Sequence, residues 1–278
     1  ANIIRRASTN LPNWLTNQIM PADLDGSTAP PAGAPGIFLR QVDDELTTPA
    51  TANATNDFLE IWEFAPDFNT PANSTYAKVA DIPIADFDRL IGANAGAGSP
   101  DIEQPGTGVQ LDSLPHFIMW RLQYRNFGAY ETLVANFTVD TGEDATPDLD
   151  GGTAAEQAGV RWFELRKTGG GSWALHQEGD IAPDTTHRWM GSAGMNGDGS
   201  IAVGYSASST TVSPGIRYSG RVAGDALGTM QAENVLMAGT GAVLFSGGRW
   251  GDYSSLSIDP VDDATFWFTT EYSDGSNN

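Results

Sequence analysis

Cysteine is absent from this 278-residue chain, and lysine occurs only at Lys78 and Lys167. The lack of cysteine excludes disulfides and thiolate sites, but it does not exclude secretion, because a domain of this size can bury a core without cross-links. Cations are scarce as well: 14 Lys and Arg stand against 35 Asp and Glu, giving a net charge of -21. We therefore expect neither nucleic acid nor an anionic membrane as a partner, since both require a cationic surface.

Long hydrophobic runs and helical periodicity are also missing. No run approaches the roughly 18 apolar residues that a membrane-spanning helix needs. No segment sustains an apolar spacing of 3.6 residues, and only residues 82–91 and 154–158 are candidates for short helices. The 32 Gly and 16 Pro residues indicate many tight turns. Together these features predict a single all-β region.

One phrase occurs twice in the sequence. Arg188-Trp189 and Arg249-Trp250 each precede a short predicted strand, an acidic turn and a second predicted strand. A hairpin that recurs after roughly 60 residues is typical of β-propellers. We therefore predict an all-β fold, a β-propeller or propeller fragment of antiparallel four-stranded blades.

The blades can be placed along the chain from its turn signals and alternating segments. The residues before about Gly36 read as loops, and Phe117–Arg125 reads as one long strand. The predicted units are a loop-rich entry with a first partial blade (1–110), a blade (111–186), a second blade (187–247) and a partial blade (248–278).

The half-built last blade would expose a strand edge, which proteins avoid. We expect the missing strands to come from the remainder of the precursor as a second fragment, or from other copies in a homo-oligomer. The chain starts at Ala1 without a leader, which suggests that a signal was removed or that the chain begins inside a precursor.

Three runs carry a resemblance to a known group of proteins: Tyr124–Gly128, Gly215–Arg221 and Arg249–Pro260. They resemble secreted bacterial β-propeller proteins with Asp-box-like repeats of the sialidase-like type, and the likeness extends from about Asp23 onward. The resemblance implies a propeller, of which this chain is similar to a C-terminal part, and an extracellular location. It implies no particular activity. The arginine motif of sialidases is absent, so the fold alone does not imply sialidase activity.

Candidate ligand-binding residues lie at the starts of the predicted inner strands. They are Arg121, Arg125, Arg188, Trp189, Arg249, Trp250 and Tyr253. If the inner strands line a central channel, arginines at its mouth would hold carboxylate or sulfate groups, and tryptophan would stack on a sugar. The alternative is that each Arg-Trp pair packs one blade against the next. Repetition of the pair favours this architectural interpretation.

Carboxylates suggest two further sites. Glu131 and Asp252 are candidates for an acid and base pair of the kind that glycosidases use. Asp144, Asp148 and Asp150, followed by two glycines, are candidates for a structural calcium site built from oxygen ligands; the alternative is a solvated acidic loop. No other cofactor is expected.

Two hypotheses about function follow. The first is a secreted, non-enzymatic interaction or structural module that binds a protein chain or a polysaccharide. The alternative is a sialidase-like glycan hydrolase that acts at the channel mouth. The two differ in whether Arg188, Arg249, Asp252 and Glu131 point into an open pocket or into the packing between blades.

Overall fold

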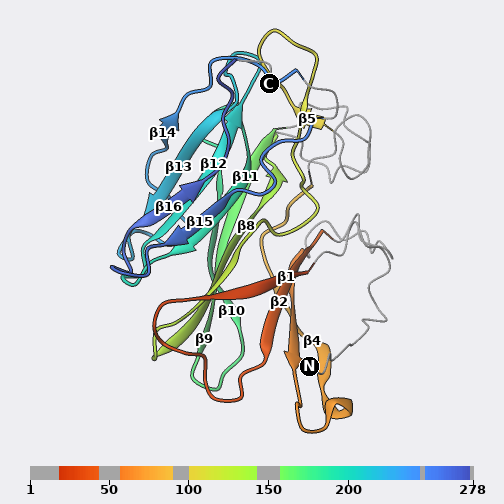
Figure 1. Ribbon diagram of the computed structural model, residues 1–278, viewed down its shortest axis with the longest axis vertical. Coiled ribbons are helices and arrows are strands. Elements are labelled where there is room, and N and C mark those ends of the chain that lie inside the picture. Colours follow the sequence, from red (N-terminus) through yellow and green to blue (C-terminus); the bar gives the residue numbers. More distant parts are fainter. Residues whose placement is uncertain (1–18, 44–56, 90–99, 143–156, 245–247, 276–278) are drawn as a thin grey trace.

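The computed structural model describes residues 19–43, 57–89, 100–142, 157–244 and 248–275 (Figure 1). Apart from one short 3-10 turn at Pro71–Asn73, the regular elements in these residues are all β-strands, so the predicted all-β class is confirmed. The helix expected over 82–91 is wrong in its described part, because residues 82 and 83 end a strand and 84–89 are irregular. In the other helix candidate, Ala158 begins a strand.

The largest element is a curled, eight-stranded sheet shaped like half a barrel. Its strands, in spatial order, are β10 (Ala174–Ile181), β9 (Ala158–Thr168), β8 (Tyr130–Asp140), β7 (Leu122–Asn126), β1 (Met20–Asp25), β2 (Gly36–Val42), β3 (Phe58–Ala65) and β4 (Thr75–Pro83). Neighbours are antiparallel except β1 and β7, which run parallel. Two antiparallel four-stranded meanders, β1–β4 and β7–β10, are therefore joined into one sheet by a single parallel pair.

The N-terminal segment that the sequence predicts as loops contains strand β1, so that prediction is wrong for residues 20–25, whereas residues 26–35 contain no strand. Its turn-like residues are extended and pair with β2 and β7, and residues in and just before β7 bind their carboxylates. Arg121 Nη1 donates to Asp23 Oδ2 at 2.6 Å, and Gln123 Nε2 donates to Asp25 Oδ2 at 2.5 Å. These contacts fix the end of β1 in the middle of the sheet.

The predicted long strand Phe117–Arg125 is shorter than expected, since β7 begins only at Leu122. The preceding residues instead divide between two cores. Phe117 and Met119 are buried in one hydrophobic cluster, and Ile118 is buried in another. Neighbouring residues of a regular strand would also lie on opposite faces, but residues 117–121 are not in a strand. This segment lies at the junction between the two cores.

A second sheet contains four antiparallel strands: β11 (His187–Met195), β12 (Ile201–Ser208), β13 (Gly215–Arg221) and β14 (Asn234–Met237). The remaining strands of the described residues form two small hairpins: β15 (Ser255–Ile258) with β16 (Phe266–Thr269), and β5 (Pro100–Ile102) with β6 (Leu111–Asp112). The β11–β12 and β15–β16 hairpins are those that the repeated Arg-Trp phrase predicts.

Strand β11 separates two packing interfaces (Figure 1). On one face Ala193 and Met195 join a core cluster with β8 and β9, which belong to the eight-stranded sheet. On the other face the Ser192 hydroxyl accepts a hydrogen bond from the Leu256 backbone N–H of β15 at 2.9 Å. The order of layers is therefore the curled sheet, the four-stranded sheet and the C-terminal hairpin.

Candidate functional site

Arg121 and Arg125, predicted at the channel mouth, are tied into the protein. Arg121 is buried and forms ion pairs with Asp23 and Asp25 of β1. Arg125 is also buried and donates to both carboxylate oxygens of Asp263, at 2.8 and 2.5 Å. The Arg125 hydrogen bond lowers the pKa of Asp263. These two arginines therefore link the curled sheet to the first strand and to the turn of the C-terminal hairpin.

Arg188 is fully buried beneath a second ionic cluster. Its guanidinium contacts Asp184 at 2.7 Å and Glu233 at 2.8 Å. Glu233 also accepts hydrogen bonds from Tyr205 at 2.9 Å and from Arg217 at 2.6 Å. Burial favours the protonated form of Glu233, but the bonds from Arg188 and Arg217 outweigh it and lower the pKa of Glu233. Arg188 has no side chain surface left for a ligand.

The proposed acid and base pair is not brought together by shared contacts. Glu131 is buried, accepts a hydrogen bond from the Tyr124 hydroxyl at 2.6 Å and lies 3.5 Å from Lys167. Asp252 instead pairs with Arg249. Glu131 is thus a buried residue of β8 in the curled sheet, whereas Asp252 lies at a cavity near the C-terminal hairpin.

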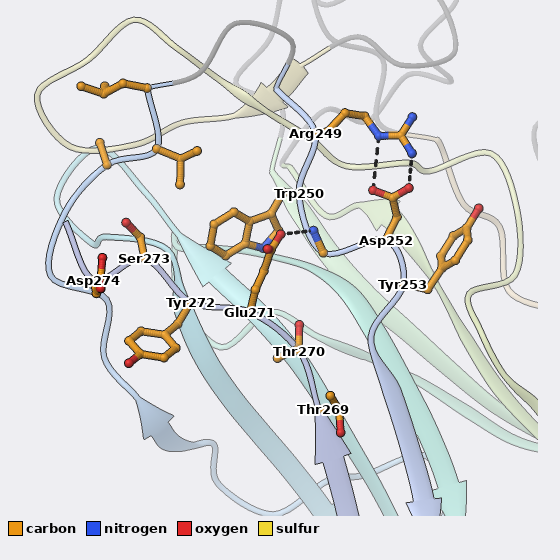
Figure 2. A pocket seen from close by; sticks show the side chains of 14 residues that line it. Arg249, Trp250, Asp252, Tyr253, Thr269, Thr270, Glu271, Tyr272, Ser273 and Asp274 are labelled. Carbon is orange, nitrogen blue, oxygen red and sulfur yellow. Dashed lines mark hydrogen bonds and ion pairs between the residues drawn. The ribbon is translucent and has the colours of Figure 1, made fainter. Parts of the chain in front are cut away.

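This cavity has a volume of about 940 Å³ and is formed by three segments (Figure 2). Its lining residues are Ala242, Val243, Leu244, Arg249, Trp250, Gly251, Asp252, Tyr253, Thr269, Thr270, Glu271, Tyr272, Ser273 and Asp274. Four of them, Arg249, Trp250, Asp252 and Tyr253, come from the second copy of the repeated phrase. The structure therefore gathers part of the predicted site and leaves Arg121, Arg125, Arg188 and Trp189 outside the lining.

Aromatic groups line the cavity in two different states. Trp250 is almost completely buried and packs against Trp189 with ring centroids 6.3 Å apart. Tyr253 and Tyr272 are 50% and 44% exposed, so their rings are accessible to a ligand. In Figure 2 the two tyrosines lie on opposite sides of Trp250 and Glu271. The accessible aromatic surface is thus supplied by tyrosine, not by the tryptophan that the sequence pattern emphasised.

The polar groups of the cavity are held by short-range contacts. The Arg249 guanidinium pairs with the Asp252 carboxylate, and these contacts raise the pKa of Arg249. Glu271 accepts a hydrogen bond from the Gly251 backbone N–H, which joins the two walls (Figure 2). The buried Thr270 hydroxyl has no hydrogen-bond partner among the described residues. Of these groups, the exposed Glu271 carboxylate is available to a polar ligand, whereas the Thr270 hydroxyl is buried.

A buried carboxyl group lies behind the Arg249–Asp252 pair. Burial raises the pKa of Asp112, and the charge of Arg249 opposes this effect only in part while that of Asp252 adds to it. Burial and the Asp252 charge likewise raise the pKa of Tyr253. Asp112, Glu271 and Tyr272 were not predicted as site residues. Asp112 and the adjacent pair Glu271-Tyr272 come from two segments with no common motif, and only the folding of the chain brings them close to the 249–253 segment.

The predicted calcium ligands Asp144, Asp148 and Asp150 lie outside the described residues. Within the described part of the chain, no group of three or more His, Asp or Glu side chains is arranged to hold a metal ion. No helix in that part is long and apolar enough to cross a membrane.

No protein-family model matches this chain. Neither a curated protein nor a solved structure matches it.

Proposed function

We propose that this chain is a secreted, non-enzymatic binding module that holds a polysaccharide in the cavity beside the C-terminal hairpin. The observation that carries the proposal is the pair of half-exposed rings, Tyr253 and Tyr272, on the wall of a cavity that also presents carboxylates. Sugar rings present an apolar face and a rim of hydroxyls. Tyrosine rings can stack on the former, while carboxylate oxygens accept hydrogen bonds from the latter.

The charge of the cavity narrows the class of sugar. Asp252 and Glu271 contribute carboxylates, and the positive charge of Arg249 is already engaged by Asp252. An anionic polysaccharide would therefore bring uncompensated negative charge to an acidic chain. A neutral or amino-sugar polymer suits the cavity better.

The wider architecture that we propose is propeller-like. Its support is the succession of packed units: the β11–β14 meander lies on the curled sheet, and the β15–β16 hairpin lies on the meander in turn. Consecutive sheets packed face to face are how propeller blades are arranged. The acidic, cysteine-free composition is compatible with the proposed extracellular location.

The test is binding of soluble neutral and amino-sugar polysaccharides, measured by calorimetry or affinity electrophoresis. We expect Tyr253→Ala and Tyr272→Ala each to weaken binding by about tenfold, because each removes a stacking surface. The matched control is Trp267→Ala, which removes a 59% exposed ring of β16 that does not line the cavity. Loss of binding in the control alone, or no binding by any polysaccharide, would reject the proposal.

One observation supports a second candidate, a glycan hydrolase. Asp112 has a raised pKa and lies close enough to Asp252 for their charges to interact. A protonated and an ionised carboxyl group are the combination that glycosidases require. Hydrolysis of fluorogenic glycosides would test this candidate. If the protein hydrolyses them, and if Asp112→Asn and Asp252→Asn each abolish the activity, the protein is an enzyme and the binding-module proposal is rejected.

A further inference from the structure

The C-terminal hairpin covers only half of the four-stranded sheet. A Cβ placed on Gly194 of β11 would lie 2.7 Å from the Leu256 side chain of β15, and one on Gly204 of β12 would lie 2.6 Å from the Phe268 ring of β16. Strand β15 therefore lies over β11, and β16 lies over β12. Strands β13 and β14 extend beyond the hairpin.

The face of the sheet next to β16 is open to solvent. Tyr218 of β13 pairs directly with Gly204, and Asn234 of β14 pairs directly with Tyr218. Residues paired in this way share one face of a sheet, so both side chains are on the face that the hairpin covers at Gly204. Tyr218 is nevertheless 37% exposed, and Asn234 is exposed. A strand lying beside β16 would cover them.

The outer edge of β16 has backbone groups that can bind such a strand. Among the described residues β16 pairs only with β15, in a regular register without a bulge. The Asp259 N–H donates to the Thr265 carbonyl at 2.8 Å, which marks that pair as hydrogen-bonded. Because bonded and non-bonded pairs alternate, Phe266 and Phe268 direct their N–H and C=O groups away from β15.

We propose that this outer edge binds an extended polypeptide segment as the third strand of the hairpin. The strand-acceptor edge consists of Phe266–Thr269, with Tyr218 and Asn234 beneath the added strand. Main-chain hydrogen bonds to β16 would provide much of the affinity. Every second side chain of the bound segment would face Tyr218, and those positions favour apolar residues.

A second copy of this chain does not fit as the occupant in the antiparallel arrangement. Its own β11 and β12 lie beneath its hairpin, as they do here, and would enter the space that β13 and β14 occupy. The occupant is instead a strand without a sheet beneath it, contributed by a different chain.

Charge defines the occupant further. Asp259 and Asp262 lie in the turn that leads into β16, and Asp225 lies in the loop that follows β13. None of these three carboxylates forms a salt bridge with another described residue. The strand-acceptor edge itself has no charged side chain. The best match is therefore a segment that alternates apolar residues with lysine or arginine.

This inference goes beyond the proposed polysaccharide binding and does not depend on it. The cavity and the strand-acceptor edge have different ligands, so failure of one assay leaves the other unaffected.

The experiment uses the full chain and a fluorescent peptide that alternates valine and lysine. We expect saturable binding, together with slower hydrogen exchange at the Phe266 and Phe268 amides. Tyr218→Lys should weaken binding by about tenfold or more, because it adds a like charge beneath the bound strand. Val79→Lys is the matched control: it makes the same charge change at a 50% exposed position in β4 of the curled sheet and should alter affinity less than about twofold.

Three results would overturn the proposal. The first is the absence of saturable binding, and the second is binding without protection of the two amides. The third is equal weakening by Tyr218→Lys and Val79→Lys, which would indicate only general attraction between opposite charges. A dimer of the peptide-free chain that protects the same amides would assign the edge to a second copy and would also contradict the proposal.

Discussion

The indole N–H of Trp250 donates a hydrogen bond to the Ser206 hydroxyl at 3.0 Å. The same indole packs against Trp189, so the tryptophans of the two Arg-Trp phrases touch each other. The repeated phrase therefore has a packing role at its tryptophans: each copy contributes one ring to the junction between the four-stranded sheet and the segment that leads to the C-terminal hairpin.

Replacement of Trp250 by Ala should destabilise the protein by about 3 to 5 kcal/mol, because a large buried ring leaves a cavity and Ser206 loses its donor. Chemical denaturation would measure the loss. Trp267→Ala removes an exposed indole and should cost less than about 1 kcal/mol. Equal stability of the two variants would show that Trp250 is not a packing residue.

Gly204→Ala should destabilise the protein by about 1 to 3 kcal/mol, since the new Cβ would overlap the Phe268 ring. The hairpin must then shift away from β12, and exchange of its backbone amides should accelerate. Gly224→Ala is the control, because a Cβ there meets no atom within 4 Å. A stable Gly204→Ala variant with unchanged amide exchange would contradict the packing of β16 over β12.

Arg188→Met should lower stability by about 3 to 5 kcal/mol, because it leaves the carboxylate of Glu233 with one fewer cation in a partly buried site. The double variant Arg188→Met with Glu233→Gln should recover part of the loss, because it removes the uncompensated charge. Thermal unfolding of the single and double variants would measure this coupling. Additive losses would show that the two residues act independently.

His116 should make stability depend on pH between about 6.5 and 4. Burial, assisted by the charge of Arg89, lowers the pKa of His116 to about 4. In this range the unfolded chain binds a proton that the folded protein does not bind, so stability falls as the pH falls. The expected loss between pH 7 and pH 5 is about 2 kcal/mol. Denaturation of the wild type and His116→Gln at both values checks this, and identical losses would refute it.

The sequence is informative about structure where contacts are local. Alternating residues and acidic turns predict the β11–β12 and β15–β16 hairpins, because a hairpin depends on neighbouring residues. By contrast, β1 reads as a turn in isolation. In the structure it pairs with β7, and the side chains that bind its carboxylates, Arg121 and Gln123, lie about a hundred residues away.

The candidate site is predictable to the same limited extent. Arg249, Asp252 and Tyr253 lie within five residues of one another and all line one cavity, although the sequence assigns Asp252 to a pair with Glu131. Tyr272 cannot be recognised as a site residue from the sequence. Its place in the cavity wall opposite Tyr253 depends on backbone hydrogen bonds of the next residue, Ser273, with Pro214 and Thr240. The ionic roles of Arg125 and Arg188 depend on distant acidic partners that no sequence spacing indicates.

The parallel pairing of β1 with β7 has a consequence for the order of folding. Ala22 meets Leu122 across that pair, so closing it requires a loop of about a hundred residues. The loops within the β7–β10 and β11–β14 meanders are far shorter than this, so these meanders can form before β1 and β7 meet. Until β1 pairs with β7, the edge of β7 that binds β1 has free backbone groups that can pair incorrectly. The pairing of β1 should therefore be the slowest and most error-prone step in folding.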